Sequence, residues 1–264
     1  MLVVVAGLVG ALVVAPFLNH AILRWLGWRV TLPLLFGRVP PLSSLGDPRV
    51  ACRRCSGDLA PGGLPAWPWL AMRGRCRACR EPLARWPLLV ELATGALFAL
   101  AAWQVDDWRL LVPSLVLFTG LVAVSTVDLL CSRIPTRFVY RTGAAVAVAA
   151  LPRVAEAPDS VTGAAVGGAL CLGALGAMHL VSPSMLGFGD VRLGTLIGLV
   201  VGWAGWTAAE PVLDPVARVV QAVFVAGIVG SLLGIVLLAI RRANQAYPFG
   251  PCLALGAVAV LLAI

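Results

Sequence analysis

Long apolar runs separated by short polar connections dominate the chain. Eight of these runs approach the roughly 20 residues that a helix needs to cross a bilayer core. They span residues 2–23, 86–104, 110–127, 138–151, 161–181, 191–206, 219–240 and 249–264. No alternating pattern typical of a membrane barrel occurs, and lipid-facing backbone groups need partners within their own segment, so we expect helices.

Composition strengthens this interpretation. The chain has 264 residues, of which 60% are hydrophobic and 12% are charged, so a soluble domain would expose far too much apolar surface. The sequence therefore predicts an all-α polytopic membrane protein with about eight transmembrane helices. It divides into a first helix at 1–23, a loop domain at 24–85 and a seven-helix membrane domain at 86–264.

The positive charge predicts how the helices are oriented. The formal net charge is +8, and arginine supplies all of the positive side chains because the chain has no lysine. Arginines gather in alternate connections: eleven lie from Arg24 to Arg85, and six more are Arg133, Arg137, Arg141, Arg192, Arg241 and Arg242. The intervening connections are acidic or balanced and hold Arg109, Arg153 and Arg218. By the positive-inside rule these connections are cytoplasmic and the amino terminus lies outside. We expect no nucleic-acid partner, because no binding module accompanies the charge.

The first cytoplasmic connection carries paired cysteines. Cys52, Cys55, Cys76 and Cys79 form a C-x2-C-x20-C-x2-C pattern, which predicts a tetrahedral zinc site with four thiolate ligands. Four ligands leave no open position for water, so the zinc is expected to be structural. Disulfides are disfavoured in the reducing cytosol, and a redox dithiol needs a fold context that the sequence does not show; both remain alternatives.

Two aspartates stand at the cytoplasmic edges of apolar runs. Asp128 follows the third run, and Asp190 closes the segment Gly187–Phe188–Gly189–Asp190. A carboxylate beside hydrocarbon is a functional candidate by default, and two on one face suggest an acid-base dyad. Alternatively, Asp128 pairs with Arg133, and Asp190 is a helix N-terminal charge after a turn. The glycines allow a close backbone approach or an unwound helix entry.

The remaining cysteines and both histidines are expected to serve packing. Cys131, Cys171 and Cys252 lie in or beside spans, where cysteine packs as a small hydrophobe. His20 and His179 are isolated near span ends and are expected to pack or to form hydrogen bonds.

Taken in order, these motifs resemble the prepilin peptidases, the membrane aspartyl peptidases of type IV pilus and type II secretion systems. The matching segments are Phe17–Asn19, the paired cysteines, Arg73–Cys76, Pro87–Leu92, Asp128, Gly187–Asp190 and Pro248–Pro251. The resemblance implies that Asp128 and Asp190 are catalytic, that Gly187, Gly189, Pro248 and Gly250 support them, and that the four cysteines hold zinc. The chain departs from the family pattern at Arg192, where Lys is usual, at Thr136, where Asp is frequent, and at Arg53, where Pro is frequent.

The resemblance also implies the reaction and its place. The expected substrates are prepilins and pseudopilins, cut where a short basic leader meets an apolar helix, at the cytoplasmic face of a prokaryotic plasma (inner) membrane. One carboxylate would take a proton from water while the other, protonated, polarises the scissile carbonyl. Many members also methylate the new amino terminus with S-adenosylmethionine, for which Gly74 and Glu91 lie in matching segments.

Three other functions stay open at this point. A peptidase without methyltransferase activity is the nearest alternative. A transporter would also place carboxylates in membrane helices, but neither an inverted repeat nor a reason for the cysteine loop is visible. A zinc-bearing membrane scaffold would explain the loop and leave the aspartates without a role.

Overall fold

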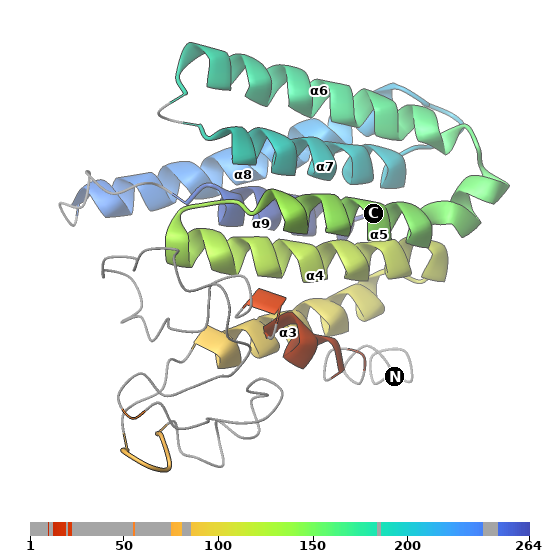
Figure 1. Ribbon diagram of the computed structural model, residues 1–264. Helices are drawn as coiled ribbons and strands as arrows, with labels where there is room; N and C mark the ends of the chain where they lie inside the picture. Colours follow the sequence, from red (N-terminus) through yellow and green to blue (C-terminus); the bar gives the residue numbers. More distant parts are fainter. Residues whose placement is uncertain are drawn as a thin grey trace. The chain divides into compact units, whose positions relative to one another are not determined.

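The described part of the chain is helical. The computed structural model describes residues 10, 13–19, 21–22, 55, 75–80, 86–183, 186–239 and 248–264. Residues 13–19 and 21–22 are helical. The following helices, labelled as in Figure 1, are α3 (Trp86–Gln104), α4 (Trp108–Cys131), α5 (Thr136–Glu156), α6 (Ser160–Val181), α7 (Phe188–Ala204), α8 (Leu213–Ala239) and α9 (Gly250–Leu261).

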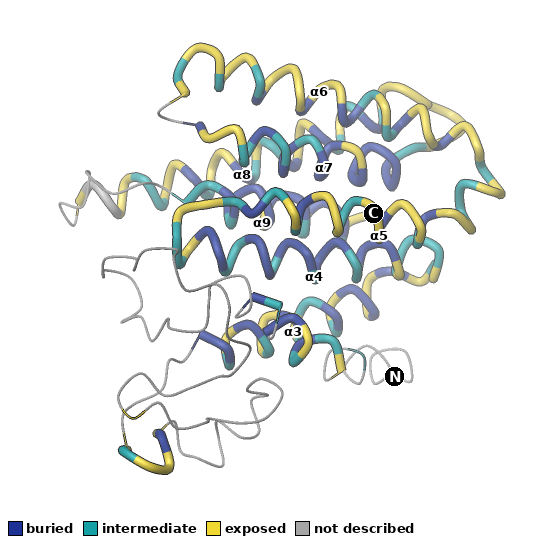
Figure 2. The backbone as a smooth tube through the Cα atoms, viewed as in Figure 1, coloured by how far each residue is buried: buried dark blue, intermediate teal, exposed yellow. Residues whose placement is uncertain are grey.

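The contacts divide the chain into two compact units. Unit 1 comprises Met1–Leu100 with Leu129–Cys131, and unit 2 comprises Ala101–Asp128 with Ser132–Ile264. Unit 2 holds all of α5 to α9, and α7 is its central helix because it packs against α5, α6, α8 and α9. Most of α7 from Val191 to Ala204 is buried, whereas much of α6 is exposed, as Figure 2 shows.

Glycines bring α6 and α7 into backbone contact. Gly163 and Gly167 on α6 face Gly198 and Gly202 on α7, each pair spaced by four residues. A Cβ atom on Gly202 would overlap the carbonyl oxygen of Gly163, and one on Gly198 would overlap that of Gly167. This small-xxx-small spacing lets membrane helices approach closely and gain dispersion energy in the absence of a hydrophobic driving force.

Other helices expose apolar side chains that a soluble fold would bury. On α8 the exposed residues recur about every four positions, which places them on one helix face. They are Val220, Phe224, Ile228, Leu232, Ile235 and Val236. Among the described residues, four helices are long and apolar enough to cross a membrane: Trp86–Gln104, Trp108–Cys131, Ser160–Val181 and Leu213–Val236. An all-helical membrane protein, as the sequence predicts, accounts for this surface.

Several helix ends differ from the predicted ones. The third predicted run, 110–127, was expected to end before Asp128, but α4 continues to Cys131 and ends where Ser132 adopts a left-handed conformation with φ 49°. Asp128 therefore lies inside a helix. α5 extends beyond 138–151 in both directions and passes through Pro152, and α7 begins at Phe188, so Asp190 is already helical. Most of the predicted first span at 2–23 and of the loop at 24–85 lies outside the described residues.

Ion pairs join the start of α4 to the end of α5. The guanidinium of Arg109 lies 2.7 Å from Glu156, and that of Arg153 lies 3.5 Å from Asp107. Asp107 also caps α4, because its side chain accepts a hydrogen bond from the Arg109 backbone N–H. Both connections were predicted to lie outside the cell, and their meeting at one end of the α4–α5 pair is consistent with that alternation.

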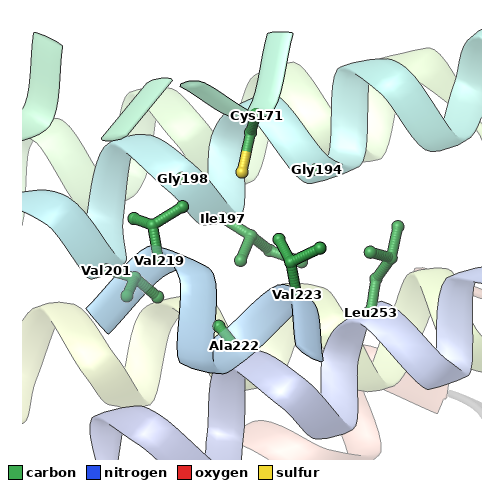
Figure 3. A pocket seen from close by; sticks show the side chains of 9 residues that line it. All are labelled: Cys171, Gly194, Ile197, Gly198, Val201, Val219, Ala222, Val223 and Leu253. Atoms are coloured by element: carbon green, nitrogen blue, oxygen red, sulfur yellow. The ribbon is translucent and has the colours of Figure 1, made fainter. Parts of the chain in front are cut away.

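A small apolar cavity lies among α6, α7, α8 and α9. Figure 3 shows its lining side chains, which come mainly from aliphatic residues and include the Cys171 thiol. None of the nine lining residues carries a charge, so the cavity offers no group for acid-base chemistry.

Candidate active site

Asp128 is a buried carboxylate with one backbone partner from a distant part of the chain. It lies in the last turn of α4 and is only 4% exposed. Its Oδ2 atom accepts a hydrogen bond of 2.9 Å from the N–H of Gly250, which is 122 residues away. No ion pair joins Asp128 to Arg133 within the part of the chain that the structure describes. The alternative of an ordinary surface ion pair at Asp128 is therefore wrong.

The start of α9 supplies this donor. Gly250 is the first residue of α9, where backbone N–H groups have no partner within the helix. Pro251 follows it, at a position that favours helix initiation. A Cβ atom on Gly250 would lie 2.9 Å from Asp128 Oδ2, so only glycine lets the backbone come this close. The segment Pro248–Pro251, identified from the sequence as a supporting motif, thus contacts Asp128 directly.

Asp190 is held by the turn that precedes it. It is the third residue of α7, and its Oδ2 atom accepts a 3.1 Å hydrogen bond from the N–H of Gly187. This contact closes the turn and places a negative charge at a helix N-terminus, where the helix dipole stabilises it. The helix starts at Phe188 without an unwound entry, so of the two roles predicted for the glycines the close approach is the one observed.

Ile134 connects the two aspartate segments. A Cβ atom on Gly189 would lie 2.9 Å from Ile134 Cβ, and one on Gly250 would lie 3.4 Å from Ile134 Cδ1. One side chain therefore packs against both glycines. Ile134 thus joins the two segments that carry the aspartates, at a place built from α4, the connection after it, α7 and α9.

Polar and aromatic contacts surround the first turn of α7. The Arg192 guanidinium donates a 2.8 Å hydrogen bond to the hydroxyl of Thr136, and it lies 4.5 Å from the centre of the Phe188 ring. His179 also contacts Phe188, with the two ring centres 5.5 Å apart. Its Nδ1 atom lies 2.7 Å from the Leu186 carbonyl oxygen. His179 thus has the packing and hydrogen-bonding role predicted for it, whereas His20 lies outside the described residues.

Three of the four predicted zinc ligands lie together in unit 1. The Sγ atoms of Cys55, Cys76 and Cys79 are all within 4.8 Å of one another, and those of Cys55 and Cys76 are 3.8 Å apart. Zn–S bonds of about 2.3 Å in a tetrahedron separate sulfur atoms by roughly 3.8 Å, so the donor set fits zinc. Arg80, in a left-handed conformation, closes the turn from Cys76 through its N–H. Cys52 lies outside the described residues.

Two other motifs of the resemblance meet in unit 1. Asn19 is fully buried, and its Nδ2 atom donates to the Pro87 carbonyl oxygen at 3.0 Å and to Glu91 Oε1 at 2.9 Å. Both bonds use the amide nitrogen, whereas the buried Oδ1 atom of Asn19 has no hydrogen-bond partner among the described residues. The bond to Oε1 holds the side chain of Glu91, one of the two candidate cofactor residues. The other, Gly74, lies outside the described residues.

Comparisons with known proteins identify the family. Residues 8–105 match the bacterial peptidase A24 N-terminal domain, and residues 115–240 match the type IV leader peptidase family. The chain is 30% identical to the type 4 prepilin-like proteins leader peptide-processing enzyme of Escherichia coli O78:H11 (strain H10407 / ETEC), over 96% of this chain and 91% of the relative. It is 31% identical to the prepilin leader peptidase/N-methyltransferase of Burkholderia pseudomallei (strain 1026b), over 84% and 70%. No solved structure matches the chain.

Proposed function

Because this chain belongs to the type IV leader peptidase family, we propose that it is a membrane aspartyl endopeptidase that removes the leader peptide from prepilins and pseudopilins. The observation that carries the proposal is that Ile134 packs against Gly189, next to Asp190, and against Gly250, which binds Asp128. Each carboxyl has one oxygen bonded to a backbone N–H, from Gly250 and Gly187 respectively. In the proposed mechanism the second oxygen of each acts on water or on the peptide.

The proposed chemistry uses the two carboxyls with one shared proton. The ionised carboxylate takes a proton from water, and the resulting hydroxide adds to the carbonyl carbon of the scissile peptide bond. The protonated carboxyl donates its hydrogen to the carbonyl oxygen, which forms a tetrahedral diol. When the C–N bond breaks, the protonated carboxyl gives its proton to the leaving nitrogen, and a diol hydroxyl gives its proton to the other carboxylate as the new carboxyl group forms. The dyad therefore again holds one proton.

The place of the site suits a substrate that changes from polar to apolar. Asp128 lies near the end of α4, before a connection that carries Arg133, and Asp190 lies at the start of α7, two residues before Arg192. By the positive-inside rule we place this end at the cytoplasmic face of the inner membrane, with the amino terminus outside and eight spans in all. A basic leader would then stay in the cytosol while the apolar segment after the cut enters the bilayer.

We assign the loop at 24–85 to a zinc-binding domain and the remainder, 86–264, to the peptidase domain. Cys55, Cys76 and Cys79 supply three thiolates that already lie together, and Cys52 is assigned as the fourth. Zinc bound by four thiolates has a structural role and would stabilise a loop that has little apolar core.

We also propose methyl transfer to the new amino terminus with S-adenosylmethionine as donor. The support is the name of relatives such as the one from Burkholderia pseudomallei, a prepilin leader peptidase/N-methyltransferase. Within this chain, Glu91 is the described candidate, and its contact with Asn19 gives it a fixed position. Gly74 is the second candidate residue.

The test replaces each aspartate by its amide. Asp128→Asn and Asp190→Asn keep the side-chain shape but remove proton transfer, so each variant should lose at least about a thousandfold in cleavage, and the double variant should be scarcely slower than either one. Purified protein is incubated with a prepilin and S-adenosylmethionine, and mass spectrometry records leader loss and methyl gain separately. Asp106→Asn, a change at an exposed carboxylate, is the matched control.

Each outcome of this assay separates the alternatives. Leader loss without methyl gain identifies a peptidase that lacks methyltransferase activity. Substantial cleavage by either single amide variant, at equal abundance in the membrane, refutes the two-aspartate mechanism. No cleavage by the unmodified protein favours the transporter or the scaffold.

A further inference from the structure

One hydrogen bond links the two segments that carry the dyad. Arg192 Nη1 donates to Thr136 Oγ1 at 2.8 Å, although the residues are 56 positions apart. Thr136 is the first residue of α5, two residues after Ile134, and Arg192 lies two residues after Asp190 in α7. The bond therefore runs beside the Ile134–Gly189 contact and connects the same two segments.

Aromatic contacts fix the guanidinium from its other side. The Cζ atom of Arg192 lies 4.5 Å from the centre of the Phe188 ring. The centre of that ring lies 5.5 Å from the centre of the His179 ring. Arginine keeps a planar set of donors when it stacks on an aromatic ring, so little freedom is lost when it makes a further hydrogen bond. This stacking directs the guanidinium toward the Thr136 hydroxyl.

The two side chains suit each other chemically. A guanidinium presents several donors at a fixed geometry, and one of them reaches the Thr136 hydroxyl.

We propose that Arg192 and Thr136 are a positioning pair for the peptidase reaction, an inference that rests on the function proposed above. Their bond holds the first turn of α7, with Asp190, against the start of α5 and so keeps Asp190 in reach of Asp128. Neither residue takes part in proton transfer. Small displacements of reacting groups lower rates steeply, by about a hundredfold for roughly 1 Å, so loss of the bond affects turnover more than substrate binding.

The experiment is a double-mutant cycle on the purified full-length protein with a prepilin substrate. Thr136→Val removes the hydroxyl and keeps the shape, Arg192→Met removes the donors and keeps the length, and the third variant combines both. Thr136→Ser retains the acceptor and tests rescue. Arg137→Met is the matched control, because Arg137 is an exposed neighbour of Thr136. The readouts are kcat, KM and the apparent unfolding midpoint.

We expect each single variant to lose about tenfold in kcat with KM changed by less than about twofold, and the double variant to be no slower than the slower single variant. Thr136→Ser and Arg137→Met should keep the kcat of the unmodified protein. The inference is overturned if either single variant keeps its kcat, if the loss lies in KM, or if the two losses multiply. If Arg192→Met does not fold, the kcat of Thr136→Ser is compared with that of Thr136→Val. A loss in Thr136→Val that is absent in Thr136→Ser supports the pair, and equal kcat values for the two variants refute it.

The cycle also separates this inference from the proposed function. If the unmodified protein cleaves no prepilin, the proposed function fails, and the same four proteins are compared by their unfolding midpoints. Midpoint shifts that do not add establish the pair without the reaction. Additive shifts refute the pair independently of any activity.

Discussion

Replacement of Gly250 by alanine tests the contact that defines the site. The added Cβ atom would lie 2.9 Å from Asp128 Oδ2 and 3.4 Å from both Asp128 Cγ and Ile134 Cδ1. Real Cβ contacts are not this short, so the buried carboxyl must turn away and lose its 2.9 Å bond to the Gly250 N–H. A hydrogen bond to a charged group contributes about 1.5–3 kcal/mol, which corresponds to about a 10- to 150-fold change in rate.

Activity should therefore fall more than stability. Gly250 lies in a helix, and alanine is the better helix former by up to about 1 kcal/mol, which offsets part of the lost hydrogen bond. The variant should thus still insert and fold while its kcat for prepilin cleavage falls by about 10- to 150-fold. Cleavage is followed by mass spectrometry of the released leader at saturating substrate and at equal protein concentration.

Gly176→Ala on α6 is the matched control, because a Cβ atom there meets nothing within 4 Å. This variant should cleave at the unmodified rate. Cleavage by Gly250→Ala within about twofold of the unmodified protein would refute the reasoning. It would mean that the carboxyl does not need this backbone donor, or that it can move without consequence.

Three further predictions concern the metal, the topology and the outer ion pairs. Elemental analysis should find about one zinc per chain, less in Cys76→Ser and unchanged in Cys171→Ala; full zinc in Cys76→Ser would remove the assignment. Reporter fusions after Ala66 and after Pro158 should report opposite sides of the membrane, and agreement between them would contradict the eight-span arrangement. Glu156→Gln removes a partly exposed partner of Arg109, so the unfolding midpoint should change by the equivalent of less than about 1 kcal/mol and cleavage should not change; a large loss of either would show that this network matters more than its exposure implies.

The sequence was sufficient to predict the helices but not where they end. Apolar runs located α3, α4, α6 and α8 closely, because lipid-facing helices need apolar residues throughout their length. The end of α4 depends on the left-handed Ser132, for which the sequence has no glycine signal. Residues where a helix leaves the bilayer are mixed in polarity. The apolar run therefore stops at Val127, although the helix continues to Cys131.

The sequence named the candidate site residues but few of their contacts. Asp128, Asp190 and the glycines of both motifs were identified, since a carboxylate near hydrocarbon and a glycine beside it are unusual in a span. The partner of Asp128 was not predictable from local pattern, because Gly250 is 122 residues away and bonds through its backbone. The role of Ile134 was missed for a similar reason, since an isoleucine after a span has no distinctive signal. The Asn19–Glu91 bond likewise joins two motifs that the sequence only placed in order.

The backbone contact between α6 and α7 bears on how inactive variants of this protein should be interpreted. A genetic screen for loss of prepilin processing would recover replacements at Gly163, Gly167, Gly198 and Gly202, because any side chain there forces the two backbones apart. Such variants would resemble active-site lesions, since α7 also carries Asp190. Protein abundance distinguishes the two classes of variant. The glycine replacements should lower the amount of protein in the membrane, whereas changes at the aspartates should leave the protein in the membrane but inactive.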